Sequence, residues 1–158
     1  MKKGLIAGLL ILFVAGLLQA QFRRDPPLKL KFVPASGAKA GEMIEAKVEV
    51  DINKDFHIFS EKPEIEGVKP SRLLVEESGA FTVDKIEFPK PVEVYSDVFQ
   101  KKLNFYQDKI SITVFLKLNP GISGEIPVNG TLQFQACSDK LCLPPSKQPF
   151  SGKQVVGD

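Results

Sequence analysis

The chain has 158 residues, with 21 Lys and Arg against 19 Asp and Glu, and it contains 12 Gly, 12 Pro and two Cys. A charge balance this close to neutral, without a run of basic residues, gives no electrostatic footprint for nucleic acid or for anionic lipid. We therefore expect no nucleic-acid partner, and the chemistry of the chain has to be sought in individual residues.

The first 20 residues predict a secretory signal peptide. Lys2 and Lys3 precede an uncharged apolar run over residues 5–18, and cleavage is expected after Ala20, although Leu18 is larger than the residue usual at that site. The alternative is an uncleaved anchor, but the run is shorter than the roughly 20 residues that a spanning helix needs. Export would place the chain in the periplasm or another oxidising compartment, where a disulfide persists.

The remaining chain predicts one all-β domain. Residues 21–27, which end in Pro26-Pro27, are expected to form a linker, residues 28–152 the domain and residues 153–158 a tail. Apolar residues alternate with polar ones over residues 44–52, 110–118 and 126–134, and weaker strands are expected at 28–33, 56–60, 71–76, 80–88 and 103–107. Short strands separated by Pro and Gly predict an immunoglobulin-like antiparallel β-sandwich.

Cys137 and Cys142 bracket a four-residue segment, which is a common length for a hairpin loop. Opposed residues at the base of such a hairpin lie close enough to form a disulfide. In the strand that ends at Phe134 the even-numbered residues face the core. If the alternation continues, Cys137 faces away from the core and lies on the solvent side or under a covering loop.

The spacing alone leaves a structural staple and a redox-active disulfide both open. Closing a ring of about six residues removes only about 2 kcal/mol of chain entropy, so the bond would be a weak staple. Pro144 and Pro145 cannot donate backbone hydrogen bonds, so the arm after Cys142 is expected to be extended and exposed, with the sulfur atoms near an open edge. The alternative is that these prolines only protect an edge strand from aggregation.

The cysteines stand in two short motifs: Phe-Gln-Ala-Cys at residues 134–137 and, after a short spacer, Cys-Leu-Pro-Pro at residues 142–145. Together these motifs resemble the redox site of the N-terminal periplasmic domains of DsbD-type thiol:disulfide interchange proteins. Residues 56–59 resemble the aromatic strand of that family more loosely. Residues 95–99, followed by residues 103–106, resemble its cap-loop segment in the same looser way. The resemblance covers roughly residues 28–150, and it implies an immunoglobulin-like fold that carries the cysteine pair on one hairpin.

The resemblance also implies a role as a protein-disulfide reductase, with no cofactor beyond the dithiol itself. The reduced pair would take electrons from a membrane-embedded redox donor and give them to thioredoxin-fold proteins. Cys142 would join the partner, Cys137 would resolve the mixed disulfide, and Leu143, Pro144 and Pro145 would contact the partner. A monomer is expected. Because the chain ends at Asp158, it would be a stand-alone version or a piece of a larger architecture.

Further residues are assigned to the surroundings of the pair by the same resemblance. Phe99 would shield the sulfur atoms from a cap loop, with Asp97 beside it, and His57 and Phe59 would lie on a strand near the hairpin. Their alternatives are a core aromatic for Phe99, a turn cap for Asp97 and a surface or packing role for His57. Two cysteines and one histidine do not fill a structural zinc site, so no metal is expected. The competing function is an immunoglobulin-like binding or chaperone domain with a purely structural disulfide.

Overall fold

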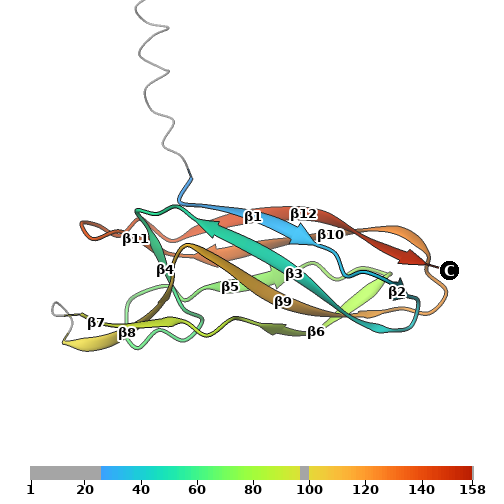
Figure 1. The fold of residues 1–158 in the computed structure, drawn as a ribbon, viewed down its shortest axis with the longest axis horizontal. Coiled ribbons are helices and arrows are strands. Elements are labelled where there is room, and N and C mark those ends of the chain that lie inside the picture. The colour runs from blue at the N-terminus through green and yellow to red at the C-terminus, as the bar shows by residue number, and fades with distance from the viewer. Residues whose placement is uncertain (1–25, 97–99, 158) are drawn as a thin grey trace, which may run out of the picture.

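The computed structural model describes residues 26–96 and 100–157, and the regular structure in these residues is entirely β-strand (Figure 1). Twelve strands follow one another in these residues: β1 (Leu28–Val33), β2 (Ala38–Lys39), β3 (Met43–Ile52), β4 (His57–Phe59), β5 (Arg72–Val75), β6 (Phe81–Glu87), β7 (Val92–Ser96), β8 (Lys101–Tyr106), β9 (Lys109–Leu118), β10 (Gly124–Phe134), β11 (Ala136–Cys137) and β12 (Ser146–Gly157).

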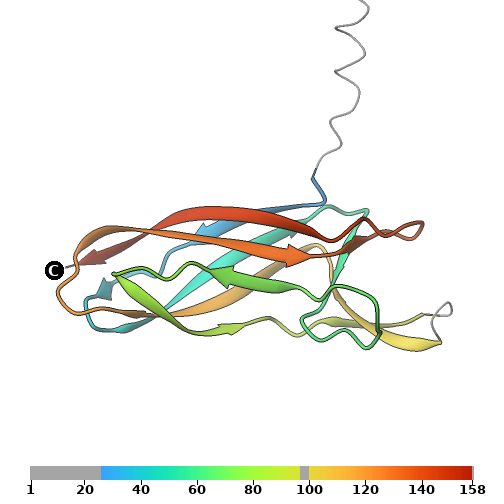
Figure 2. The ribbon, with the colours of Figure 1, turned by 180° about the vertical axis from the view of Figure 1, so that it is seen from behind.

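Eight of these strands form a sandwich of two four-stranded sheets, with strand orders β1-β3-β9-β6 and β2-β12-β10-β5. All pairings in the two sheets are antiparallel except the short parallel contact of β2 with β12. Figures 1 and 2 show the long axis of the molecule running along the strands, with the C-terminus at one end. The all-β immunoglobulin-like sandwich predicted from the sequence is confirmed.

The core follows from the two-residue period of the long strands. In β3 every second residue is buried, and Val48 and Val50 are fully enclosed. Ile112, Val114 and Leu116 of the neighbouring β9 are equally buried, whereas Thr113 and Phe115, which alternate with them, are more exposed. Because alternate side chains of a strand leave on opposite faces, the apolar residues of each sheet meet those of the other and hold the sandwich together by burial of their surface.

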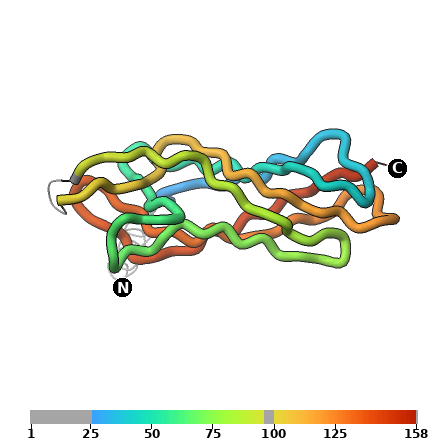
Figure 3. The backbone as a smooth tube through the Cα atoms, turned by 90° about the horizontal axis from the view of Figure 1, so that it is seen from below, coloured from blue at the N-terminus to red at the C-terminus, as the bar shows by residue number. Residues whose placement is uncertain are grey.

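A third sheet, with strand order β11-β4-β8-β7, is built at one end from continuations of the two main sheets. Strand β4 continues β3 after a short turn, and β8 leads into β9 through Asp108, whose backbone has a positive φ of 59°. Strand β11 continues β10 beyond Gln135, which interrupts the strand. The third sheet therefore joins a continuation of one main sheet (β11) to continuations of the other (β4 and β8), at the end away from the C-terminus (Figure 3).

Four of the observed strands were not predicted from the sequence: the two-residue strands β2 and β11, and the longer strands β7 and β12. Residues 153–158 were expected to be a tail, but β12 runs to Gly157 and pairs with β10 from Ser146 to Val156. Gln154 is the reason why the end of β12 was not predicted as a strand. This polar residue is only 1% exposed, and its side-chain amide accepts a hydrogen bond from the Ala35 N–H and donates one to the Ala35 carbonyl. A buried glutamine breaks the apolar alternation by which strands are predicted.

No helix in residues 26–96 and 100–157 is long and apolar enough to cross a membrane.

Candidate functional site

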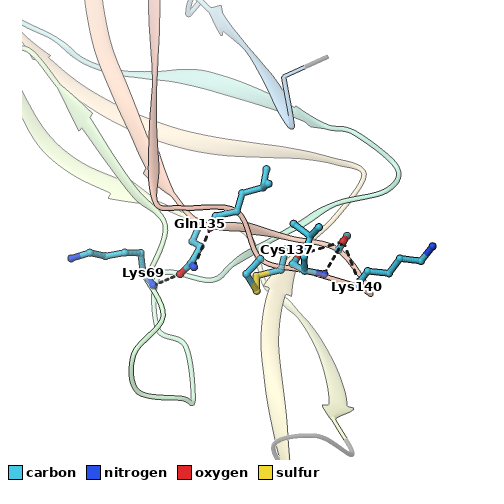
Figure 4. The surroundings of a disulfide bond; sticks show 8 residues. Lys69, Gln135, Cys137 and Lys140 are labelled. Atoms are coloured by element: carbon cyan, nitrogen blue, oxygen red, sulfur yellow. Dashed lines mark hydrogen bonds between the residues drawn. A yellow bond between two sulfur atoms is a disulfide. The ribbon is translucent and has the colours of Figure 1, made fainter. Parts of the chain in front are cut away.

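Cys137 and Cys142 are joined by a disulfide at the base of a tight hairpin, with 3.9 Å between their Cα atoms. The Ser138 N–H donates to the Leu141 carbonyl at 2.8 Å, and the Ser138 hydroxyl accepts from the N–H groups of Lys140 and Leu141 at 3.3 Å each. Below the disulfide, the Leu143 N–H donates to the Ala136 carbonyl at 2.8 Å. Hydrogen bonds on both sides of the disulfide thus hold the hairpin closed (Figure 4).

The two cysteines differ sharply in their access to solvent. Cys137 is only 2% exposed, although it lies outside the main core cluster, whereas Cys142 is exposed. Of the two positions expected for Cys137, the solvent side is wrong, because the residue is buried. Pro144 and Pro145 are exposed as expected, while Leu143 is half-buried and packs against the core. A reagent from solvent meets the Cys142 side of the bond first.

His57 lies directly opposite Cys137 in the pairing of β4 with β11. Its ring is 4.5 Å from that of Phe105 and 6.2 Å from that of Phe59, measured between ring centroids. Phe59 and Phe105 are themselves a cross-strand pair of β4 and β8, and both are buried. One face of the third sheet therefore carries the disulfide, the histidine and two aromatic rings in a row. Phe105 is an additional neighbour that the sequence analysis did not single out.

Burial is the main influence on the His57 imidazole and lowers its pKa below the ordinary value of 6.5. The carboxylate of Asp139, in the hairpin turn, acts in the opposite direction and raises the pKa by a smaller amount. Both residues line a largely polar pocket of about 660 Å³ beside the hairpin. His57 is therefore held mostly neutral near Cys137 at neutral pH, with one ring nitrogen able to accept a proton.

The lowered pKa of His57 predicts a pH dependence of stability. Below pH 6.5 the unfolded chain protonates this imidazole while the folded chain resists, so the free energy of unfolding should fall as the pH drops from 6.5 through the folded-state pKa. Urea unfolding at about pH 7.5 and about pH 5.5 should show a smaller drop for His57→Gln than for the parent chain. An equal drop in both chains would contradict this assignment.

Gln135 connects the hairpin to the loop before β5. Its side-chain oxygen accepts the Lys69 N–H at 3.0 Å, and its side-chain nitrogen donates to the Leu143 carbonyl at 3.2 Å (Figure 4). Both ends of the amide are thus used to position the arm that follows Cys142. In the sequence Gln135 stands out only as part of the cysteine motif, and the signal for its role is that an amide can donate and accept hydrogen bonds at once.

Two of the residues assigned from the sequence, Asp97 and Phe99, lie outside the described residues. Within residues 26–96 and 100–157 no group of three or more His, Cys, Asp or Glu residues could hold a metal ion.

Comparison with solved structures gives distant likenesses to periplasmic domains. The N-terminal periplasmic domain of ScsB from Proteus mirabilis has a TM-score of 0.57 at 14% identity, over 83% of this chain and 48% of that one. The reduced N-terminal domain of DsbD from Neisseria meningitidis has a TM-score of 0.45 at 16% identity, over 80% and 90% of the two chains. The present chain thus spans about half the length of the ScsB structure.

A third solved structure is the complex between the DsbD and PilB N-terminal domains of Neisseria meningitidis. It has a TM-score of 0.46 at 16% identity, over 76% of this chain and 80% of that one. No curated protein matches the chain significantly. The family model of the N-terminal region of the thiol:disulfide interchange protein DsbD matches residues 29–153, a span that contains both cysteines and all strands of the third sheet. By this match the chain belongs to the DsbD N-terminal domain family.

Proposed function

We propose that this chain is an exported thiol–disulfide exchange module, which passes electrons through Cys137 and Cys142 to thioredoxin-fold proteins. A membrane-embedded redox protein would restore the reduced pair. The observation that carries the proposal is the unequal access to the two sulfur atoms, since Cys142 is exposed and Cys137 is buried beside His57. Thiol–disulfide exchange needs one accessible sulfur that forms the mixed disulfide with the partner. It also needs a second sulfur, protected from solvent, that resolves this mixed disulfide.

The mechanism follows from this division. The Cys142 thiolate attacks one sulfur of the partner's disulfide, and the partner's other sulfur leaves as a thiolate, which gives a mixed disulfide at Cys142. Cys137 then loses its proton, for which the neutral His57 opposite it is the nearest candidate base, and attacks the Cys142 sulfur. The partner departs with both sulfur atoms reduced, and the Cys137–Cys142 bond is formed. Two electrons have passed to the partner.

A structural role for the disulfide is the weaker candidate. The hairpin is already closed by hydrogen bonds at Ser138 and Leu143, on either side of the sulfur atoms. The covalent bond adds only about 2 kcal/mol through its short ring.

The reduction potential separates the two functions. Equilibration with glutathione buffers, followed by thiol counting, should give a value of about −180 to −270 mV, the range of known exchange proteins. A value below about −300 mV, together with a bond that reduced thioredoxin leaves intact, would identify a structural disulfide and end the exchange proposal.

A further inference from the structure

A second concave surface lies beside the redox hairpin, between the edges of the two main sheets. We call it the lateral groove, and it has a volume of about 610 Å³. Strands β5 and β6, the outermost strands of their sheets, form its sides, and the start of β12 closes one end. In Figure 2 the segment before β5 lies beside the third sheet, and β5 runs along β10. Pocket and redox hairpin therefore occupy the same end of the molecule.

The floor of the lateral groove is apolar. Leu73 and Phe134 belong to the main core, and Ile86 and Phe88 are half-buried at its margin. Ile86 and Phe88 pack against the core on one side and remain partly accessible on the other. An apolar side chain laid over them would remove this surface from water and gain the corresponding free energy.

The rim of the lateral groove is positively charged. Lys69, Arg72 and Lys147 are exposed, and none of the ion pairs among the described residues includes them. Arg72 and Lys147 flank Gln133 in one row across β5, β10 and β12, so two like charges share a face without a counter-charge between them. Such a row has the charge and the donor groups that carboxylates bind.

The one acidic residue of the groove does not neutralise this rim. The carboxylate of Glu61 accepts the hydroxyl hydrogen of the buried Tyr106. Burial first, and then this hydrogen bond and the Glu61 charge, raise the pKa of Tyr106 above its ordinary value of 10.0, so the hydroxyl stays protonated. Glu61 is therefore directed to an internal donor, and three cations face one engaged anion.

The lateral groove is linked to the exposed sulfur by a short stretch of chain. Pro145 lines the groove and lies three residues after Cys142, which is about 10 Å of extended backbone. The Gln135 side chain holds both segments that lie between the groove and the sulfur. It accepts a hydrogen bond from the Lys69 N–H on one side and donates one to the Leu143 carbonyl on the other. A peptide seated in the groove would thus place its neighbouring residues within reach of Cys142.

We propose that the lateral groove docks an extended acidic segment of the protein that exchanges with Cys142. An apolar side chain of the segment lies over Ile86 and Phe88, and flanking carboxylates bind Lys69, Arg72 and Lys147. This inference rests on the proposed function, because it names the class of partner segment that exchange at Cys142 would use. An acidic segment fits the groove, whereas a basic one would add to the unpaired positive charge.

Binding is tested with a fluorescein-labelled short peptide in which glutamates flank a central leucine and phenylalanine. We expect fluorescence anisotropy to report saturable binding that weakens with salt, and no binding of the matched peptide with lysines in place of the glutamates. Lys147→Glu should raise the Kd about fivefold or more. Its control is Lys47→Glu, an exposed lysine of β3 on the other main sheet, which should change the Kd less than about twofold. Equal binding of both peptides, or equal effects of both variants, would overturn the proposal.

The link to the sulfur is tested with the same two peptides, each carrying a cysteine at one end. The peptide thiolate attacks Cys142, the Cys137–Cys142 bond breaks, and Cys137 leaves as a thiolate and is protonated from solvent. The acidic peptide should react at least about tenfold faster than the basic peptide, because docking raises its effective concentration. Glutathione should react equally with the parent chain and Lys147→Glu. Acidic and basic thiols that react at one rate would overturn docking next to Cys142, whereas a potential below about −300 mV would overturn exchange and leave peptide binding intact.

Discussion

Replacing Cys137 by serine is expected to convert the domain into a trap for its partner. Cys142 remains exposed and can still attack a thioredoxin-fold disulfide, but the resolving sulfur opposite His57 is gone, so the mixed disulfide accumulates. Non-reducing gel electrophoresis after mixing with an oxidised thioredoxin should show a covalent complex in Cys137→Ser and none in the parent chain. Complete transfer of two electrons to the partner should be abolished.

Replacing Cys142 by serine should abolish electron transfer without producing that complex. The remaining thiol, Cys137, is 2% exposed, and a partner disulfide cannot approach it in line. A small aromatic disulfide reagent should therefore label Cys137→Ser at least about tenfold faster than Cys142→Ser. The double replacement is the control for stability. Each single variant loses the same short disulfide ring as the double variant, worth about 2 kcal/mol, so all three should have similar free energies of unfolding.

The opposite labelling order would reverse the assignment of the attacking sulfur while leaving exchange itself in place. Transfer that continues at the parental rate in both single variants would contradict the proposed function. Such a result would direct the search to the surface of the sandwich, since the hairpin would then be only a structural element.

Much of the fold could be predicted because its signals are local. The alternation in β3 and β9 reports burial on one face, and strand β1 was placed at its observed limits. The hairpin spacing likewise predicted the disulfide between Cys137 and Cys142. In each case the residues that determine the feature lie within a few positions of one another, so the feature can be read from a single sequence.

The remainder depends on pairings between distant segments. The burial of Cys137 follows from the break at Gln135, which carries β11 out of the sheet of β10 and places it beside β4. Alternation of buried and exposed residues predicts the facing of Cys137 only for a continuous strand, and the strand is interrupted at Gln135. Lys69, Arg72 and Lys147 are unremarkable in sequence, and only the register of β5, β10 and β12 aligns two of them across Gln133. The charged groove therefore lies near the cysteine hairpin because of how β5, β10 and β12 are aligned, and this alignment cannot be read from the sequence.

The reason for a glycine at position 130 lies in the pairing of β10 with the distant strand β12. In the sequence it stands at a core-facing position of the strand where an apolar residue is expected. In the structure it faces Phe150 of β12, whose ring fills the space above it and stacks on Phe32 with 6.4 Å between centroids. The glycine is required because β12 supplies the missing side chain from across the sheet, and β12 was the strand least visible in the sequence.

Gly130→Ala is accordingly expected to destabilise the domain by about 3 kcal/mol. The new Cβ would lie 2.5 Å from two ring atoms of Phe150 and would collide with the Leu74 backbone carbonyl. The ring can move only by disturbing the core, and the carbonyl belongs to β5, which pairs with β10 at this point. Urea unfolding measures the loss, and Gly79→Ala is the matched control, because its Cβ meets nothing within 4 Å.

The control should be neutral or slightly stabilising, since alanine lowers the entropy of the unfolded chain and costs nothing in open space. The reduction potential of Gly130→Ala, measured where it remains folded, should equal that of the parent chain, because Ser138 and Leu143 hold the hairpin by bonds that do not involve Gly130. Equal stability of the two alanine variants would show that Phe150 does not occupy the position above β10. The pairing of β12 with β10 that aligns Lys147 with Gln133 and Arg72 would then be wrong, and with it the row of charges at the rim of the lateral groove.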